Sequence, residues 1–492
     1  MTNYLWCHHS SMSGEKKMVS ETDSQAVLQT LPISPETSSI RLSNLVGPAF
    51  VLDAKAYQKE FAEALNRVED WQDEVVALST LADVFVPNRI KLVTTSESNH
   101  GATYLKAHDI FNVRPSSSRH LVKSRTQAYE TLLLKKGMIL TPSSGRNLGP
   151  LAFVGHALAG FGMTDIMRIV PHCPDKGYLL YAFLMTKTGQ ALIRRGRSGT
   201  NIDHLSPADV KKIPILVPDS GTTQSIIRST KKAEELLDSA RQALTDADRK
   251  LSSILKIKNY LPDEGVQRVA GLRRYTRNSA SLSLRLDAAF YDPANINAGL
   301  ELAKAGGRKL GELANLKMMG RYKRYYVDGE NGTPIVSGRQ LFQLRPVSLK
   351  HISDRSFSDP ETFRLKKGWT VFTCDGRSEE ALGHPALVSS HWNDWMASNH
   401  VMRAIPKDNT PPGFLYLALR NPLVQLQLKS RATGSVVDAL DPKTIADVVL
   451  PTLDQAVMKE LGEQVERAYE NIGESQKLLA ETVKKFQRTI DR

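Results

Sequence analysis

The chain has 492 residues, of which 41% are hydrophobic and 24% charged, and its formal net charge is +13. This composition is ordinary for a globular protein, and the length leaves room for about three domains. The three cysteines are scattered, imply no disulfide framework and fit a reducing compartment such as the cytoplasm. The basic balance favours a polyanionic partner, either nucleic acid or an acidic membrane, with solubility alone as the alternative.

The first 40 residues are rich in Ser, Thr and Gln, so we expect a disordered tail, within which Met12 or Met18 could be the true start. Apolar residues recur at helical spacing over residues 54–69, which predicts a helix. The most apolar long stretch, residues 151–167, contains ionisable side chains and glycines, and this predicts a buried core segment rather than a membrane span. The sequence does not begin with the basic-then-apolar pattern of a secretory signal.

One stretch of the chain occurs twice. The thirteen residues "LKKGMILTPSSGR" begin at Leu134, and "LKKGWTVFTCDGR" begins 231 positions later at Leu365, with six identities. Three more pairs of segments follow the same order at shifts of 231, 236 and 235 residues: 101–115 with 332–346, 177–184 with 413–420, and 199–207 with 434–442. This period is far too long for a solenoid and predicts two related domains. In each domain we expect short strands such as "GMILT" and "WTVFT", and a helical segment over residues 179–195 or 414–431.

A long apolar seam follows each copy. From Ile226 to Ile254 the apolar positions advance by alternate steps of four and three residues, with Thr230 as the weak member, and the same spacing runs from Met458 to Phe486. This is the heptad spacing of a coiled coil. Each helix would have about 30 residues and a length of ~45 Å. The two seams are predicted to pair with each other; the alternative is two amphipathic helices, each packed on its own domain.

These features predict an α+β protein with two repeated α/β domains, each followed by a long helix. The expected order is a tail (1–40), a first domain (41–218), a central helix (219–262), a linker (263–282), a second domain (283–453) and a C-terminal helix (454–492).

Catalytic motifs are missing from the sequence. It contains no phosphate-binding loop ending in Lys-Ser/Thr, no Asn-Pro-Pro-aromatic tetrapeptide of the amino-methyltransferases, and no Gly-x-Ser-x-Gly elbow. The "CHH" of residues 7–9 has no second pair of ligands, so no metal site is predicted. Binding rather than catalysis is therefore expected.

Basic and amide side chains recur at equivalent positions of the two copies. An arginine ends each "SGR" or "DGR" turn and suits phosphate or guanine contact, with a structural ion pair as the alternative. The loops "RRGRSGTN" and "KSRATGS" place cations beside flexible glycines, against a phosphate backbone or simply in solvent. "KAHDIFNVR" and "SGRQLFQLR" carry side chains that can read base edges, and their phenylalanines are expected in the core. The candidate DNA-binding residues are Lys106, His108, Arg114, Arg146, Arg194, Arg195, Arg197, Thr200, Asn201, Arg339, Gln340, Gln343, Arg345, Arg377, Lys429, Arg431 and Ser435.

The layout resembles the specificity subunit of type I restriction-modification systems over roughly residues 40–492. The resemblance is carried by the duplicated "LKKG…GR" pair, by "SGTNIDHLSPADVKKIPILVP" and "TGSVVDALDPKTIADVVLP", and by the helix after each. The glutamine that usually follows soon after the second phrase is matched by Gln224 and Gln455, whereas "RLSNLVGPAFVLD" matches the family less well than "SLRLDAAFYDP" does.

The resemblance implies that each domain is a target-recognition domain that grips one half of a bipartite, asymmetric site in double-stranded DNA. It implies that the two helices pack antiparallel as a spacer between the half-sites. Two methyltransferase subunits, which bind S-adenosylmethionine and methylate adenine, would dock on this spacer, and restriction subunits that translocate DNA would join them. The chain itself would bind no cofactor and catalyse nothing.

Three alternatives stay open. The chain could serve another phage-defence methyltransferase that has no restriction subunit. It could be a coiled-coil adaptor that uses its repeats to bind protein. It could also be an enzyme with an unfamiliar site, although the missing catalytic motifs count against this alternative.

Overall fold

The computed structural model describes residues 58–88, 90–145, 147–198, 203–257, 266–269, 272–282, 285–376, 381–434 and 437–492. The expected tail and the "CHH" of residues 7–9 lie outside these ranges. Helix α2, Lys59–Glu69, confirms the described part of the helix predicted over residues 54–69. Residues 63–492 form one compact unit.

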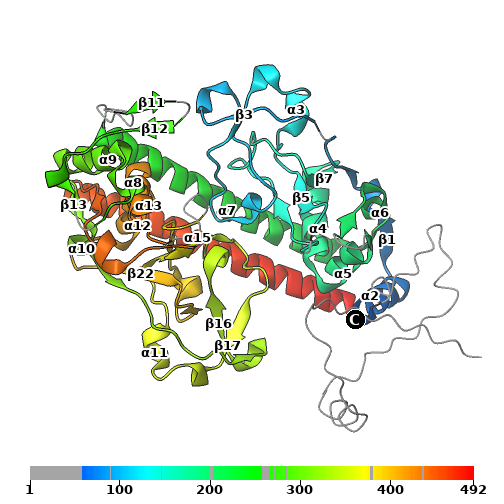
Figure 1. Cartoon of the computed structure of the whole chain (residues 1–492). Coiled ribbons are helices and arrows are strands. Elements are labelled where there is room, and N and C mark those ends of the chain that lie inside the picture. Colours follow the sequence, from blue (N-terminus) through cyan, green and yellow to red (C-terminus); the bar gives the residue numbers. More distant parts are fainter. Residues whose placement is uncertain are drawn as a thin grey trace, which may run out of the picture. The chain divides into compact units, whose positions relative to one another are not determined.

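An antiparallel four-stranded sheet lies at the centre of the first repeat, in the order β2-β7-β5-β6 (Figure 1). Its strands are β2 Ala82–Phe85, β7 Ile166–Pro171, β5 Ile139–Pro142 and β6 Ala152–Phe153. The predicted strand "GMILT" is therefore confirmed as β5. The buried residues Ile139, Leu140 and Ile169 place the two central strands in the core.

The second repeat has a sheet with the same order and the same antiparallel pairing, β14-β22-β18-β20. Its strands are β14 Ala314–Lys317, β22 Val401–Pro406, β18 Thr370–Thr373 and β20 Pro385–Leu387. Here β18 confirms the predicted strand "WTVFT". A further sheet, in the order β15-β17-β16-β21, consists of β15 Tyr326–Val327, β17 Lys350–Ile352, β16 Thr333–Val336 and β21 Met396–Ala397.

A buried arginine stands at the same place in both central sheets. Arg168 of β7 and Arg403 of β22 are 1% and 0% exposed. Arg168 donates to the carbonyl oxygens of Leu132 and Met163, and Arg403 donates to those of Val401 and Ala397. Burial lowers the pKa of both arginines to about 10. The bonds of Arg168 thus tie helix α3 (Tyr129–Leu132) and the loop before β7 to that strand, and the bond of Arg403 to Ala397 ties β21 to β22.

The helical segment expected in each repeat is two helices rather than one. In the first repeat, α4 Pro174–Met185 ends at Thr186, whose hydroxyl accepts from the Gly189 amide and begins α5 Lys187–Arg195. In the second, α12 Pro412–Arg420 and α13 Pro422–Ser430 are separated by Asn421, whose side chain caps α13. At each of these points a capping residue ends one helix and begins the next, although the apolar residues of the sequence continue across the break.

Short elements complete both repeats. The first also contains β1 Glu74–Ala77 paired with β10 Pro214–Val217, β3 Thr94–Thr95 with β4 His120–Leu121, β8 Arg197–Ser198 with β9 His204–Leu205, α3 Tyr129–Leu132 and α6 Pro207–Lys211. The second contains β13 Arg308–Lys309 paired with β24 Val449–Leu450, β19 Asp375–Gly376 with β23 Asp438–Ala439, α8 Ala288–Tyr291, α9 Pro293–Lys304, α10 Leu310–Leu313, α11 Pro360–Phe363 and α14 Pro442–Ile445. Between them, β11 Gln267–Val269 and β12 Leu272–Arg274 form a hairpin.

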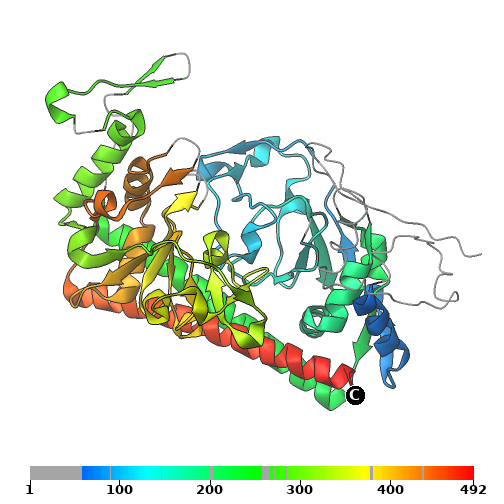
Figure 2. The same ribbon diagram turned by 60° about the horizontal axis from the view of Figure 1, so that its bottom comes forward.

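Two long helices of 36 residues each, α7 Ser220–Leu255 and α15 Gln455–Ile490, lie side by side (Figures 1 and 2). They run in opposite directions, because Lys250 pairs with Glu460 while Lys485 donates to Ser225. Each helix is longer than the ~30 residues expected and measures about 54 Å at 1.5 Å per residue.

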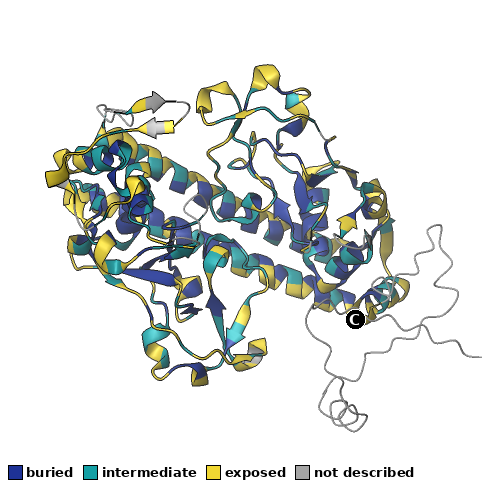
Figure 3. Cartoon of the chain, in the orientation of Figure 1, coloured by how far each residue is buried: buried dark blue, intermediate teal, exposed yellow. Residues whose placement is uncertain are grey.

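The predicted seams face the interior. Every seam position from Ile226 to Leu251 and from Met458 to Phe486 is buried, and only Ile254, 38% exposed, is not (Figure 3). Phe183 of α4 packs on Phe486 of α15, with ring centroids 5.7 Å apart, so the first repeat contacts the second long helix. The predicted seam positions are thus the buried positions of both helices, and most of the charged residues of α7 and α15 lie on the exposed faces.

The contact of α12 with α15 depends on two glycines. A Cβ atom added to Gly413 would lie 2.1 Å from the carbonyl oxygen of Gly462. Gly413→Ala is therefore expected to push the helices apart and to destabilise the protein by about 1–3 kcal/mol. Gly320→Ala is the control, because nothing lies within 4 Å of its Cβ position. Thermal unfolding of both variants checks this, and equal melting temperatures would contradict the close contact.

Candidate nucleic-acid interface

The matched segments "KAHDIFNVR" and "SGRQLFQLR" meet in space. The amide of Val113 donates to the carbonyl oxygen of Phe342, and the amide of Leu344 donates to that of Phe111, both at 2.7 Å. Asn112 and Gln343 thus form an antiparallel bridge. Equivalent parts of the two repeats therefore contact each other.

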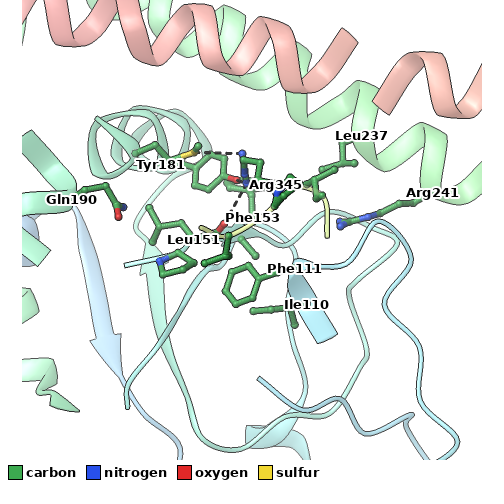
Figure 4. A pocket seen from close by; sticks show the side chains of 15 residues that line it. Ile110, Phe111, Leu151, Phe153, Tyr181, Gln190, Leu237, Arg241 and Arg345 are labelled. Atoms are coloured by element: carbon green, nitrogen blue, oxygen red, sulfur yellow. Dashed lines mark hydrogen bonds between the residues drawn. The ribbon is translucent and has the colours of Figure 1, made fainter. Parts of the chain in front are cut away.

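The guanidinium of Arg345 points into the first repeat (Figure 4). It donates to the Tyr181 hydroxyl at 2.6 Å and to the Leu151 carbonyl oxygen at 3.3 Å. Around it is a cavity of about 230 Å³ with an apolar lining that includes Phe111, Leu151 and Phe153. Arg345 thus stabilises a contact between the repeats, and we leave it out of the surface proposed to bind DNA.

Arg114 is also taken up within the protein. Its side chain is 12% exposed, forms an ion pair with Asp248 of α7 and donates to the Leu244 carbonyl oxygen at 3.3 Å. Burial alone would lower the pKa of Arg114, but the nearby Tyr416, Asp248 and Tyr469 raise it above its usual value. It too is left out of the proposed DNA surface.

The side chains of the two candidate glutamines form hydrogen bonds within their own loop. The Gln340 side chain donates to the Val347 carbonyl oxygen at 2.9 Å and accepts from the Ser337 amide at 3.2 Å. Gln343 accepts from the Val347 amide at 2.9 Å. In the same two segments, Lys106, His108 and Arg339 are exposed, and these three stay in the proposed surface.

The cations after α5 and α13 lie at matching ends of the two repeats. Arg194, Arg195 and Arg197 are half-buried, and Arg197 lies 4.0 Å from a carboxylate oxygen of Asp203. Lys429 and Arg431 are also half-buried. Arg431 donates to the Gln427 carbonyl oxygen at 3.0 Å, and burial lowers its pKa. The candidates Arg146, Thr200, Asn201, Arg377 and Ser435 lie outside the described residues.

Sequence reasoning missed a basic aromatic loop, residues 321–326, "RYKRYY", which follows β14 and ends at Tyr326, the first residue of β15. All of its residues except Tyr322 are exposed, and Tyr325 and Tyr326 are 43% and 46% exposed. Lys350 of the neighbouring strand β17 lies over the Tyr326 ring at 4.5 Å, and Lys323 lies over the Tyr325 ring at 5.1 Å. The cations and two of the tyrosines thus lie together on one exposed surface.

The cations of this loop lack carboxylate partners. Within the described residues, no ion pair holds Arg321, Lys323, Arg324 or Lys350, and the polar partner of Arg324 is the neutral Asn399 at 3.1 Å. Elsewhere in the same repeat the exposed Arg308 and Lys309 each pair with an acid, at 3.0 and 2.7 Å. Unpaired cations beside exposed rings suit phosphates and unstacked bases.

Among the residues that the structure describes, no helix is both long and apolar enough to cross a bilayer. The described side chains also include no group of three or more His, Cys, Asp or Glu that could hold a metal ion.

Similarity to known proteins is found among solved structures alone. No protein-family profile matches the chain, and no curated protein is similar to it in sequence. Among solved structures, the chain is similar to the S subunit of a type I restriction-modification system from M. genitalium, with a TM-score of 0.34 and 14% identity over 86% of this chain and 95% of that one. The HsdS subunit from Thermoanaerobacter tengcongensis matches with a TM-score of 0.26 and 13% identity, covering 85% and 95% of the two chains.

A chain from a structure of the assembly and conformational transition of the type I R-M system also matches, with a TM-score of 0.26 and 13% identity over 85% and 96% of the chains. The similarity concerns the fold.

Proposed function

We propose that the chain is a DNA-specificity subunit of a type I restriction-modification complex, in which two target-recognition domains each bind one half of a bipartite DNA site. One observation carries the proposal. Two sheets with the same strand order are each followed by a 36-residue helix, and these helices lie antiparallel. Two similar binding units on one rigid spacer suit a target with two separated halves.

The dimensions fit this function. A pair of helices about 54 Å long spans roughly one and a half turns of DNA, since one turn measures ~34–36 Å. The proposed DNA surface combines the basic aromatic loop with Lys106, His108, Arg194, Arg195, Arg197, Arg339, Lys429 and Arg431. The net charge of +13 supports phosphate binding.

The partners follow from the same arrangement. The solvent-facing sides of α7 and α15 carry charged residues such as Lys231 and Arg249, 53% and 71% exposed. We propose that two methyltransferase subunits, each holding S-adenosylmethionine, dock along this paired-helix surface. Restriction subunits would bind to that complex, and this chain would supply recognition alone.

The direct test is to co-express the chain with the methyltransferase encoded beside it and to map methylated adenines across the host genome. A split motif with two unlike halves and a fixed gap is the expected result. Methylation by this chain alone would instead support an enzyme. Failure of the two proteins to co-purify, together with no salt-dependent DNA binding, would support the protein-binding adaptor.

A domain exchange tests whether the two halves are modular. Replacing residues 100–215 by the corresponding segment of another family member is expected to change one half-site and to leave the other and the gap unaltered. Both readouts come from the same methylation map. A change in both half-sites, or in neither, would refute the assignment of one half-site to each repeat.

A further inference from the structure

The contact between the two repeats is made of equivalent parts. Residues 109–114 and 341–345, which we call the joint, hold each other by the two backbone hydrogen bonds between Val113 and Phe342 and between Leu344 and Phe111. These segments come from matching positions of the duplication, so the joint is formed by equivalent parts of the two repeats.

Each side of the joint carries an arginine that reaches groups of the other repeat. Arg345, from the second repeat, enters the first repeat beside Tyr181 of α4 and Glu234 of α7. Arg114, from the first repeat, lies beside Tyr416 of α12 and Tyr469 of α15 in the second. The arginines are thus exchanged between the domains.

The receiving sites are built on equivalent positions. The capping residues Thr186 and Asn421 at the ends of α4 and α12 are 235 positions apart, and counted back from them Tyr181 and Tyr416 are equivalent. Tyr469 follows Glu234 by the same interval. In the second repeat the rings of Tyr416 and Tyr469 meet edge to face, with centroids 5.1 Å apart. In the first repeat, Glu234 of α7 stands where the second repeat has Tyr469 of α15. Glu234 is 7% exposed. Each repeat therefore receives an arginine from the other repeat. The group on the long helix beside that arginine is a carboxyl in the first repeat and a tyrosine ring in the second.

The joint also contacts α7, one of the two long helices. Arg241 of α7, 7% exposed, donates to the carbonyl oxygens of Asn112 and Val113 at 2.9 and 3.0 Å. Arg114 pairs with Asp248, two turns further along the same helix. The position of each domain along the paired helices is thus linked to the position of the other.

We propose that the joint fixes the separation of the two reading domains, so that Arg114 and Arg345 are positioning residues that set the length of the gap between half-sites. This rests on the proposed function. Neither arginine contacts DNA in this scheme. Its loss should alter which gaps are accepted while the bases read in each half-site stay the same.

A measurement without DNA tests the geometry first. In the full chain with Cys7 and Cys173 changed to serine, spin labels are placed at the exposed positions Ser98→Cys and Ser358→Cys. Double electron–electron resonance should give one narrow distance distribution for the parent protein. Arg114→Met, and Arg345→Met combined with Glu234→Gln, should broaden or shift it. The double change removes the buried carboxyl that Arg345 would otherwise leave without its cation.

Arg308→Met is the matched control, since Arg308 is an exposed arginine of the second repeat that pairs with Glu312. It should leave the distribution unchanged. If all variants melt like the parent and keep its distance distribution, the joint does not position the domains. Arg114 and Arg345 are changed in separate proteins. If one variant does not fold, the other still tests whether the joint positions the domains.

The methylation map then supplies the functional readout. With the joint variants, sites whose gap is one base pair longer or shorter should gain methylation by about tenfold, the ratio that corresponds to one lost charge-assisted hydrogen bond. The half-site sequences should stay as in the parent. A strict parental gap in well-folded variants would overturn the inference. Absence of a bipartite motif in the parent would overturn the proposed function instead, and the distance measurement would still decide the joint.

Discussion

Replacement of Arg321, Lys323 and Arg324 by alanine is expected to weaken binding to a mixed-sequence DNA duplex by roughly 10- to 100-fold at moderate salt. The slope of log affinity against log salt concentration should fall by about 2.7, since each lost phosphate contact removes about 0.9. A salt titration of DNA binding by fluorescence anisotropy measures both quantities. The effect should be large because these cations have no carboxylate partner in the described structure that already neutralises them.

The same repeat offers a control with an equal change of charge. Lys304, Arg308 and Lys309 are exposed and pair with Glu301, Glu312 and Asp447 at 2.7 to 3.0 Å. Alanine at these three positions should change affinity and salt slope much less. Equal losses in the two triple variants would mean that net charge, rather than the basic aromatic loop, governs binding.

Substitution of Glu234 by glutamine is expected to stabilise the protein above neutral pH and to have little effect in acid. Burial raises the pKa of Glu234 to about 7 from an ordinary 4.5, although Arg345 and Arg241 oppose this rise and Asp238 adds to it. Between these pH values the folded protein keeps a proton that the unfolded chain has lost, so stability falls as pH rises. Once the carboxyl is ionised in both states the penalty is complete, at about 3 kcal/mol.

Thermal unfolding at about pH 5 and pH 8 measures this difference. The difference in melting temperature between variant and parent should increase with pH, because glutamine removes the cost of ionising the buried carboxyl. Glu235→Gln is the control, since Glu235 is the next residue on the same helix but is 63% exposed and near Lys231. If the difference in melting temperature between Glu234→Gln and the parent did not depend on pH, burial would not disfavour the ionised carboxyl.

Features set by local periodicity could be predicted from the sequence. The steps of four and three that begin at Ile226 and Met458 define which faces of α7 and α15 are buried. The alternation of apolar residues with turns identified strands β5 and β18. The break of a helical segment at Thr186 was missed, because one hydroxyl that caps the next helix hardly alters an apolar pattern.

The partner of a long side chain could not be predicted in the same way. Arg114 and Arg345 stand among polar residues that suit base reading, and only the fold shows that each crosses to the other repeat. The basic aromatic loop had a local signal, three cations and three tyrosines in six residues. The first repeat has "RIKLVT" in the matching place, with no aromatic residue, so the features that the two copies share do not include this loop.

The pairing of α7 with α15 has a consequence for synthesis of the protein. The partner of the first long helix ends 235 residues after Leu255, at Ile490. At ~5–20 residues per second, a ribosome needs roughly 12–47 s to make that length. During this time the part of the α7 seam that α15 covers in the finished protein is open to wrong associations. Slower initiation, lower temperature or added chaperone capacity should therefore raise the yield of correctly folded protein more than any change to its surface.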